Sequence, residues 1–214
     1  MSRRGRRAFQ EPKQQRTREQ LAQILNVADR LFAERGYEGT RLADIAAAVP
    51  CSMSTIYDRF ASKEELLRYM HRQGTEEAIA MIDQIEPADA SDVDLRVVLP
   101  TAVQIGLSLI ERFGGRRRAV AERVHADPVL LSLESELREA LVESGRRFLL
   151  TYRHQFGHPN PELAASQAMH LMMVLTEERH SPLPVPRPLQ VDDDSFIREA
   201  CRMVTAYLGI EEDD

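Results

Sequence analysis

Four hydroxyl side chains lie close together in one short segment, at Ser52, Ser54, Thr55 and Tyr57. Hydroxyl groups and the N–H groups at the start of a helix are uncharged donors that suit phosphate oxygens. Met53, Ser54 and Thr55 are mostly small, and a helix with small outward residues near its N-terminus can approach the major groove of DNA closely. We therefore interpret this segment as a candidate for binding nucleic acid.

Signals for catalysis or metal binding are weak. The sequence has neither a Gly-rich phosphate loop nor a Gly-x-Ser-x-Gly motif. His154 and His158 have the spacing of helical metal ligands, but a glycine and a proline interrupt that stretch and no third ligand is evident. Cys51 and Cys201 belong to no metal-binding spacing. We predict that the protein is not an enzyme and has neither a metal nor a cofactor.

The composition is that of an ordinary soluble protein, with 214 residues, 43% of them apolar, and a net charge of −6. This length is ample for a sizeable core without a disulfide. No apolar run reaches the roughly 18 residues of a membrane span, and the basic N-terminus lacks the apolar stretch of a secretory leader. We expect a cytoplasmic protein that does not enter a membrane.

Charge is distributed unevenly along the chain. Residues 1–72 carry 14 basic and 9 acidic side chains, whereas residues 73–214 carry 14 and 25. Seven of the basic residues fall within the first 18 positions, which contain only one acidic residue. This end of the chain would be attracted to a polyanion, although a solvated tail that only aids solubility is the alternative.

Apolar periodicity predicts three helices near the N-terminus. The first runs from about residue 18 to 35 and ends at Gly36. Thr40 is expected to cap a second helix over residues 41–49, and Ser52 a third through Phe60. The two short helices with a tight turn between them form a helix-turn-helix pattern at about residues 41–60. A capping box at residues 62–65 begins a fourth helix.

The remainder also has helical periodicity and no sustained two-residue alternation, so we predict an all-α protein. We expect further helices over residues 92–113, 116–125, 128–155, 161–180 and 194–208. The glycine pair at positions 114 and 115 is expected to separate two of these helices. Four prolines between Ser181 and Asp193 predict an extended connection before the last helix.

Residues 17–70 resemble the DNA-binding domain of TetR-family transcriptional regulators. The resemblance rests on four successive pieces at fixed spacing, namely Ile24-Leu25-x-x-Ala28-x-x-Leu31-Phe32-x-x-x-Gly36-Tyr37-x-x-Thr40, Asp44-Ile45-Ala46, Ser52-x-x-Thr55-Ile56-Tyr57-x-x-Phe60 and Ser62-Lys63-Glu64-x-Leu66-Leu67.

This resemblance implies an N-terminal three-helix helix-turn-helix domain over residues 17–62, preceded by a basic flexible arm over residues 1–16. It also implies a larger helical domain over residues 63–214 that binds an unidentified small-molecule effector. The last two helices, at about 161–180 and 194–208, would pair the chain with a second copy. The implied function is a ligand-responsive repressor that binds a palindromic DNA operator as a dimer. The alternatives are an activator, an effector-independent regulator, or a small-molecule-binding helical protein with a weakened DNA domain.

The resemblance also implies roles for individual residues. Positions that contact the DNA backbone in the family are matched by Thr40, Thr55, Tyr57 and Lys63. Positions that read bases are matched by Arg41, Met53, Ser54 and Asp58, with Arg41 the best candidate for a guanine. Ser52 and Arg59 complete the expected DNA-binding set, and Arg59 stands where the family often has His. We expect the arm to enter the adjacent minor groove through an arginine cluster, Arg3, Arg4, Arg6 and Arg7.

Two departures from the family pattern bear on this expectation. The turn reads Val49-Pro50-Cys51-Ser52 where the family usually has Ala-Gly-Val-Ser, and proline cannot take the positive φ that glycine permits. We therefore expect the turn to follow a different path or to shift by one residue. Asp58 adds a negative charge, which could accept from a cytosine amino group or pair with Arg59 or another base-facing cation. We favour the pairing.

Overall fold

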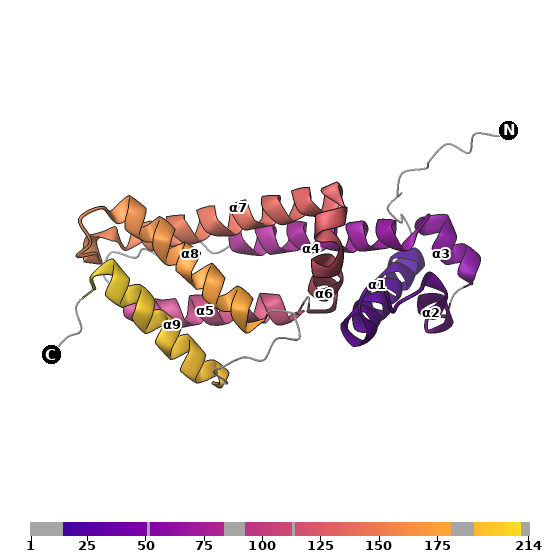
Figure 1. The fold of residues 1–214 in the computed structure, drawn as a ribbon, viewed down its shortest axis with the longest axis horizontal. Helices are drawn as coiled ribbons and strands as arrows, with labels where there is room; N and C mark the ends of the chain where they lie inside the picture. The colour runs from indigo at the N-terminus through magenta and orange to yellow at the C-terminus, as the bar shows by residue number, and fades with distance from the viewer. Residues whose placement is uncertain (1–14, 51, 84–92, 113, 181–190, 211–214) are drawn as a thin grey trace. The chain divides into compact units, whose positions relative to one another are not determined.

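The computed structural model describes residues 15–50, 52–83, 93–112, 114–180 and 191–210. This part of the chain folds into helices and contains no strand, as the sequence predicts (Figure 1). The chain divides into two compact units. Unit 1 combines residues 1–74 with residues 113–132, and unit 2 combines residues 75–112 with residues 133–214.

Unit 1 contains the predicted helix-turn-helix. Its helices are α1 (Gln15–Arg35), α2 (Leu42–Ala47), α3 (Met53–Arg59), the first part of α4 (Lys63–Asp83), α6 (Gly114–Arg123), a 3-10 turn (Val124–Ala126) and the start of α7 (Pro128–Thr151). Their apolar faces meet in one core, whose fully buried members include Ile24, Phe32, Ile45, Ile56, Phe60 and Leu66. The indigo and purple segments of Figure 1 show α1, α2 and α3 grouped together.

Local signals set the boundaries of the first helices. Gly36 has a φ of 72°, the left-handed conformation that ends α1. The Ser52 hydroxyl accepts a hydrogen bond from the Thr55 N–H at 3.2 Å, which caps α3 as predicted. The Ser62 hydroxyl accepts from the Glu65 N–H at 3.2 Å and so begins α4.

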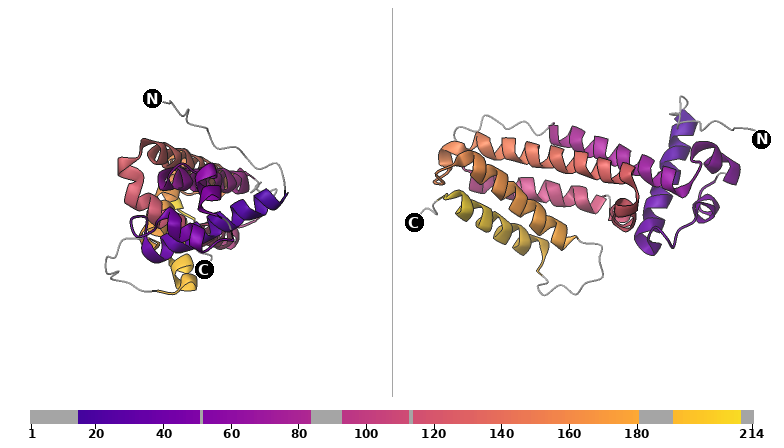
Figure 2. Two further views of the ribbon diagram at one scale, coloured as in Figure 1. Left: turned by 90° about the vertical axis from the view of Figure 1, so that its right-hand side faces the viewer. Right: turned by 45° about the horizontal axis from the view of Figure 1, so that its top comes forward.

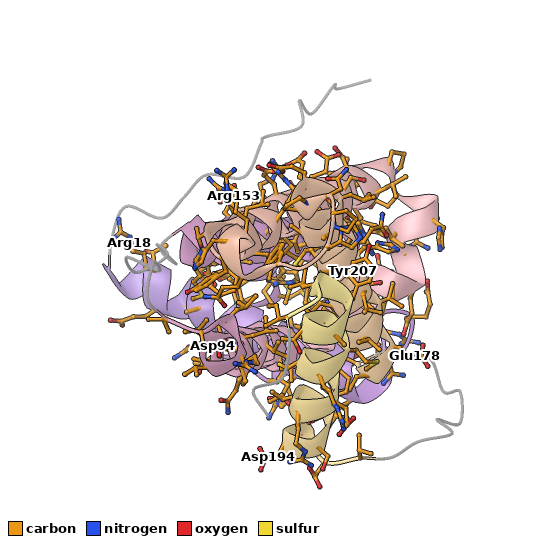
Figure 3. All side chains as sticks on the ribbon, turned by 90° about the vertical axis from the view of Figure 1, so that its left-hand side faces the viewer. Arg18, Asp94, Arg153, Glu178, Asp194 and Tyr207 are labelled. Carbon is orange, nitrogen blue, oxygen red and sulfur yellow. The ribbon has the colours of Figure 1, made fainter. Side chains whose placement is uncertain are left out.

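Unit 2 contains α5 (Leu95–Arg112), most of α7, a 3-10 turn (Arg153–Gln155), α8 (Pro161–Arg179) and α9 (Asp193–Leu208). The α9 helix packs against both α5 and α8, as Figures 1 and 2 show for the yellow, pink and orange ribbons. The core of this unit is formed by apolar residues of all four helices, among them Leu95, Val103, Leu149, Ala168, Ile197 and Val204. Figure 3 labels Asp194 near the start of α9 and Tyr207 near its end.

Three sequence-based boundaries are wrong. Arg41, not Thr40, is the N-cap residue of α2. The pair Gly114 and Gly115 lies inside α6, because that helix already begins at Gly114. The α7 helix ends at Thr151, and the residues that follow form a 3-10 turn. The proline-rich segment 181–190 lies outside the described residues.

Neither a membrane span nor a metal site was found in the described part of the chain. No helix there is long and apolar enough to cross a membrane. No group of three or more His, Cys, Asp or Glu side chains there could hold a metal ion. His158 lies in the loop after α7, where its Nδ1 is 2.9 Å from the Asn160 carbonyl oxygen. His154 and His158 therefore do not lie on one continuous helix, as the interrupting glycine and proline indicate.

Candidate DNA-binding surface

The α3 helix is anchored on one side and open on the other. Ile56 and Phe60 are fully buried in the core of unit 1. Met53 and Tyr57 are 36% and 54% exposed. This division follows from the helical period, because Ile56 and Phe60 are four positions apart and so lie on one face. The exposed face of α3 therefore carries a thioether and a phenol on a rigid support.

A chain of hydroxyl contacts surrounds the start of α3. The Ser52 Oγ lies 2.7 Å from the Ser54 Oγ and 2.9 Å from the Thr55 Oγ1. Ser52 and Ser54 are exposed, whereas Thr55 is half-buried. Each hydroxyl can donate one hydrogen bond and accept two, so this cluster retains capacity for an oxygen-rich partner. The structure thus brings these three predicted site residues together.

Arg41 and Thr40 are neighbours in sequence with opposite environments. The Arg41 side chain is exposed, and the backbone N–H of Arg41 donates to the Asp44 carboxylate at 3.0 Å. Thr40 is fully buried, and its hydroxyl donates to the carbonyl oxygens of Gly36 at 2.8 Å and Leu31 at 3.2 Å. Thr40 therefore ties the end of α1 to the start of α2. The hydroxyl that was expected to touch phosphate is engaged inside the protein.

Arg59 faces α1. Its Nη2 donates to the Thr17 carbonyl oxygen at 3.4 Å and to the Gln20 side-chain oxygen at 3.3 Å. These bonds connect the end of α3 to the first turns of α1. Asp58 is exposed and forms no ion pair with Arg59 among the described contacts, so the favoured pairing of these two residues is not observed. The sequence argument did not identify α1 as the partner of Arg59, because Thr17 and Gln20 are 42 and 39 positions away.

Lys63, the first residue of α4, contacts the segment that connects α1 and α2. Its Nζ donates to the carbonyl oxygens of Tyr37 at 2.6 Å and Thr40 at 2.8 Å. The same ammonium group lies 3.9 Å from the centre of the Tyr37 ring. Charged hydrogen bonds of this kind are stronger than neutral ones, so Lys63 stabilises the connection between α1 and α2. Its contact with DNA stays a prediction.

The proline-containing turn follows α2 without a left-handed residue at any described position. Ala48 has φ of −99° and ψ of 0°, and Val49 turns inward, where it is only 6% exposed. All described residues with positive φ are glycines, and none of them is in this turn. Pro50 is exposed, and Cys51 lies outside the described residues. The arm arginines Arg3, Arg4, Arg6 and Arg7 are outside them as well.

The α6 helix, from a distant part of the chain, packs closely on α1. A Cβ atom at Gly115 would overlap the backbone carbonyl of Asp29, so only glycine permits this approach. The Arg116 N–H donates to the Asp29 carboxylate at 2.8 Å. Burial raises the pKa of Asp29, although the bond from Arg116 acts in the opposite direction. The buried Arg116 guanidinium also donates to the Met70 carbonyl oxygen at 2.7 Å, which connects α6 to α4.

The far end of α6 holds the segment between α1 and α2. The Glu122 carboxylate accepts the N–H of Tyr37 at 2.8 Å and that of Glu38 at 3.4 Å. Arg123 also forms an ion pair with Glu38 at 3.6 Å. Two backbone donors after the end of α1 are therefore satisfied by a residue more than 80 positions away.

Sequence reasoning missed this contribution of α6. The glycine pair beside three arginines was interpreted as a break between helices. A glycine pair can also indicate that two helices approach each other closely, and that interpretation would have identified Gly115. Nothing in the local pattern points to Glu122, because its partners are backbone groups distant in sequence.

A comparison with protein families finds a match in the helix-turn-helix part of the chain. Residues 24–70 match the model of the bacterial regulatory proteins, tetR family. Over these residues the chain is similar to the N-terminal domain of that family. The match covers α2, α3 and the parts of α1 and α4 that pack on them, so it coincides with the surface described above.

Curated relatives and solved structures support the TetR-family assignment. An uncharacterized HTH-type transcriptional regulator of Mycobacterium tuberculosis is 36% identical over 81 residues, which are 36% of this chain and 40% of that protein. The aligned part thus spans less than half of the relative. These similar proteins are transcriptional regulators and not enzymes.

Similarity of fold extends over nearly the whole chain. A TetR-family transcriptional regulator from Mesorhizobium loti has a TM-score of 0.71 at 20% identity, covering 92% of this chain and 98% of its own. A transcriptional regulator from Saccharomonospora viridis, solved in complex with choline, has a TM-score of 0.65 at 19% identity, covering 91% and 100%. At this level of identity the likeness shows that unit 2 shares the all-helical fold.

Proposed function

We propose that the protein is a cytoplasmic transcriptional regulator that binds a palindromic DNA operator as a homodimer and acts as a ligand-responsive repressor. The observation that carries this proposal is the exposed face of α3 in a TetR-family domain. Met53, Ser54 and Tyr57 are presented there on a helix whose other side is buried. A single helix of this kind fits the major groove of B-form DNA.

Two kinds of contact follow from the side chains on this surface. Tyr57, Ser52 and Ser54 offer hydroxyl groups to phosphate oxygens, which position the protein without selecting a sequence. Arg41 is exposed at the start of α2 and has the geometry to donate two hydrogen bonds to a guanine. In the proposed complex, Lys63 and Arg59 support this surface through their bonds to α1 and the α1–α2 connection.

Exposed apolar side chains of α8 and α9 support a homodimer. Leu163 and Val174 are 48% and 49% exposed on α8, and Met203 and Tyr207 are 44% and 39% exposed on α9. Both pairs have spacings that keep their members on one face of their helix. A two-fold axis would bring the two helices of each copy together into four helices, which would cover these apolar groups.

The response to a ligand would pass through α6. Arg116 and Glu122 bind α1 and the α1–α2 connection, so a displacement of α6 would alter the support of α3. A ligand that favours one position of α6 would then change DNA affinity by its preference for that state. The choline complex of the Saccharomonospora viridis protein supports ligand binding in this fold.

The direct test is a mobility-shift assay with the DNA upstream of the gene for this protein. We expect a shift that requires a palindromic sequence and weakens about a thousandfold or more between 50 and 200 mM salt, if six or more phosphates are neutralised. A DNA fragment of equal length with a scrambled palindrome is the control. An affinity that is insensitive to salt, or equal for both fragments, would contradict the proposal.

A further inference from the structure

Asp58 places an exposed carboxylate on the open side of α3. It lies one helical turn after Ser54, so the two side chains share one face of the helix. Ile56 is two positions from each of them, which is about 200° around the helix axis, and it is fully buried. A negative charge is therefore present on the surface that would meet DNA, opposite the side that is fixed in the core.

The arginines near Asp58 do not neutralise it. Arg59, the next residue, donates to the Thr17 carbonyl oxygen at 3.4 Å and to the Gln20 side-chain oxygen at 3.3 Å, so it is directed toward α1. Arg41 is exposed, and among the described residues neither it nor any other cation forms an ion pair with Asp58. The carboxylate thus stays exposed to a binding partner.

DNA offers such a carboxylate few favourable partners. An ionised carboxylate can only accept hydrogen bonds, and the phosphates of DNA repel it. In the major groove the base donors are the amino groups of cytosine and adenine. Adenine carries the N7 acceptor beside its amino group, and guanine and thymine present acceptors in the groove. Cytosine is the base that presents a donor there and no acceptor of its own.

We propose that Asp58 selects cytosine at one position of each operator half-site, by accepting a hydrogen bond from the N4 amino group. The proposal rests on the proposed function, in which α3 enters the major groove. At any other base the carboxylate faces acceptors and phosphates, which disfavour binding. Asp58 therefore acts more by rejecting wrong sequences than by raising affinity.

Duplexes with an altered base test the contact with the amino group. Each carries the palindromic operator, and pyrimidin-2-one, which lacks the amino group, replaces one cytosine in both half-sites. We expect one position at which this replacement weakens binding by the parent about tenfold per half-site, as measured by fluorescence anisotropy. The same replacement should weaken binding by the Asp58→Ala variant at least fivefold less. This comparison separates the contact from any change in the duplex itself.

Substitutions at Asp58 should change the preferred base in a defined way. The amide of Asp58→Asn can form two hydrogen bonds with adenine, so the preference at that position should shift from cytosine to adenine. Asp58→Ala should lose the preference and bind a scrambled operator more tightly, because the repulsion is gone. Glu76→Gln removes an exposed carboxylate of α4 outside residues 24–70, and should behave as the parent does. Selection from a randomised operator measures these preferences.

The outcomes separate this proposal from the proposed function. Asp58 has no bond within the described residues, so its variants should melt at the same temperature as the parent. A base preference that is unchanged in both Asp58 variants, or a uniform loss of affinity at all positions, would overturn the role of Asp58 alone. A parent protein that binds the palindromic and scrambled fragments equally would overturn the proposed function together with it.

Discussion

The Glu122 carboxylate accepts the backbone N–H of Tyr37 at 2.8 Å, across 85 positions of sequence. Tyr37 is buried, and its N–H lies just beyond the end of α1. An amide that loses its only protein acceptor in such a place costs about 1–3 kcal/mol. The position of the α1–α2 connection therefore depends on α6 as well as on the helices next to it in sequence.

Removing this acceptor should destabilise unit 1. We expect Glu122→Leu to lower the free energy of unfolding by about 1–3 kcal/mol, because it leaves the Tyr37 N–H without its carboxylate partner. Glu122→Gln keeps a side-chain oxygen at the same distance from the backbone and should lose less. Urea denaturation followed by circular dichroism measures both variants. Equal stability of the leucine variant and the parent would contradict this assignment.

Gly74 provides the space for the Arg116 guanidinium. A Cβ atom at this position would overlap the guanidinium, which is buried and bonded to the Met70 carbonyl. We expect Gly74→Ala to destabilise the protein by roughly 1–3 kcal/mol even though alanine favours helix formation.

Gly106 is the matched control, because it is also helical but an added Cβ would have no atom within 4 Å apart from its chain neighbours and the nearby backbone of its own helix. Gly106→Ala should stabilise the protein by up to about 1 kcal/mol. Thermal melts of both variants measure the difference. Stabilisation by both substitutions would show that Arg116 is not confined at Gly74.

Protonation of His71 should weaken the fold in mild acid. Burial, with added repulsion from Arg116 and Arg117, lowers the pKa of His71 to about 4 from 6.5. The unfolded chain then binds a proton between pH 6.5 and 4 while the folded chain does not, so stability is complete above pH 6.5 and falls as the pH decreases. The full effect is about 3 kcal/mol. Between pH 6.5 and 4, the His71→Gln variant should lose about 3 kcal/mol less of its free energy of unfolding than the parent does. Denaturant titrations at several pH values measure this difference.

Tyr57 offers a test of contact with the DNA backbone. Tyr57→Phe removes only a hydroxyl from a side chain that is 54% exposed. We expect DNA affinity to fall about fivefold, corresponding to roughly 1 kcal/mol, on all sequences alike and with unchanged stability. Lys63→Met makes a useful comparison, because its loss of two bonds to carbonyl oxygens should lower stability as well. A Tyr57→Phe variant that binds as the parent does would remove this residue from the interface.

Arg41 should affect sequence preference more than general affinity. Its exposed guanidinium is the best candidate for a base contact, worth about 1–3 kcal/mol at one base pair. Arg41→Ala should relax discrimination at that position and leave preferences elsewhere intact. Selection of bound sequences from a randomised operator measures this directly. A uniform loss across all positions would assign Arg41 to phosphate instead.

Capping signals predicted the ends of several helices well. Gly36 ends α1, Ser52 caps α3, and Ser62 accepts the Glu65 N–H at 3.2 Å at the start of α4, all as the sequence indicates. These features depend on residues within one turn of each other, so a local pattern contains the necessary information. The helical fold class and the exposed face of α3 follow from the same kind of pattern.

Side-chain partners distant in sequence were harder to predict. Lys63 and Arg59 match family positions, yet the structure shows them donating to residues 23 to 42 positions away. Periodicity reports which face of a helix is apolar, but not which helix covers it. The place of α6 in unit 1 could not be derived for that reason.

The division of unit 1 between residues 15–74 and 113–132 also has a consequence for synthesis on the ribosome. The first stretch is synthesised before the second, so the partners that Arg116 and Glu122 provide for Asp29 and Tyr37 are absent at first. Unit 1 of a nascent chain is therefore incomplete until residue 132 has emerged. Translation that stops before residue 113 would release a fragment in which α1 and the α1–α2 connection lack their bonds to α6.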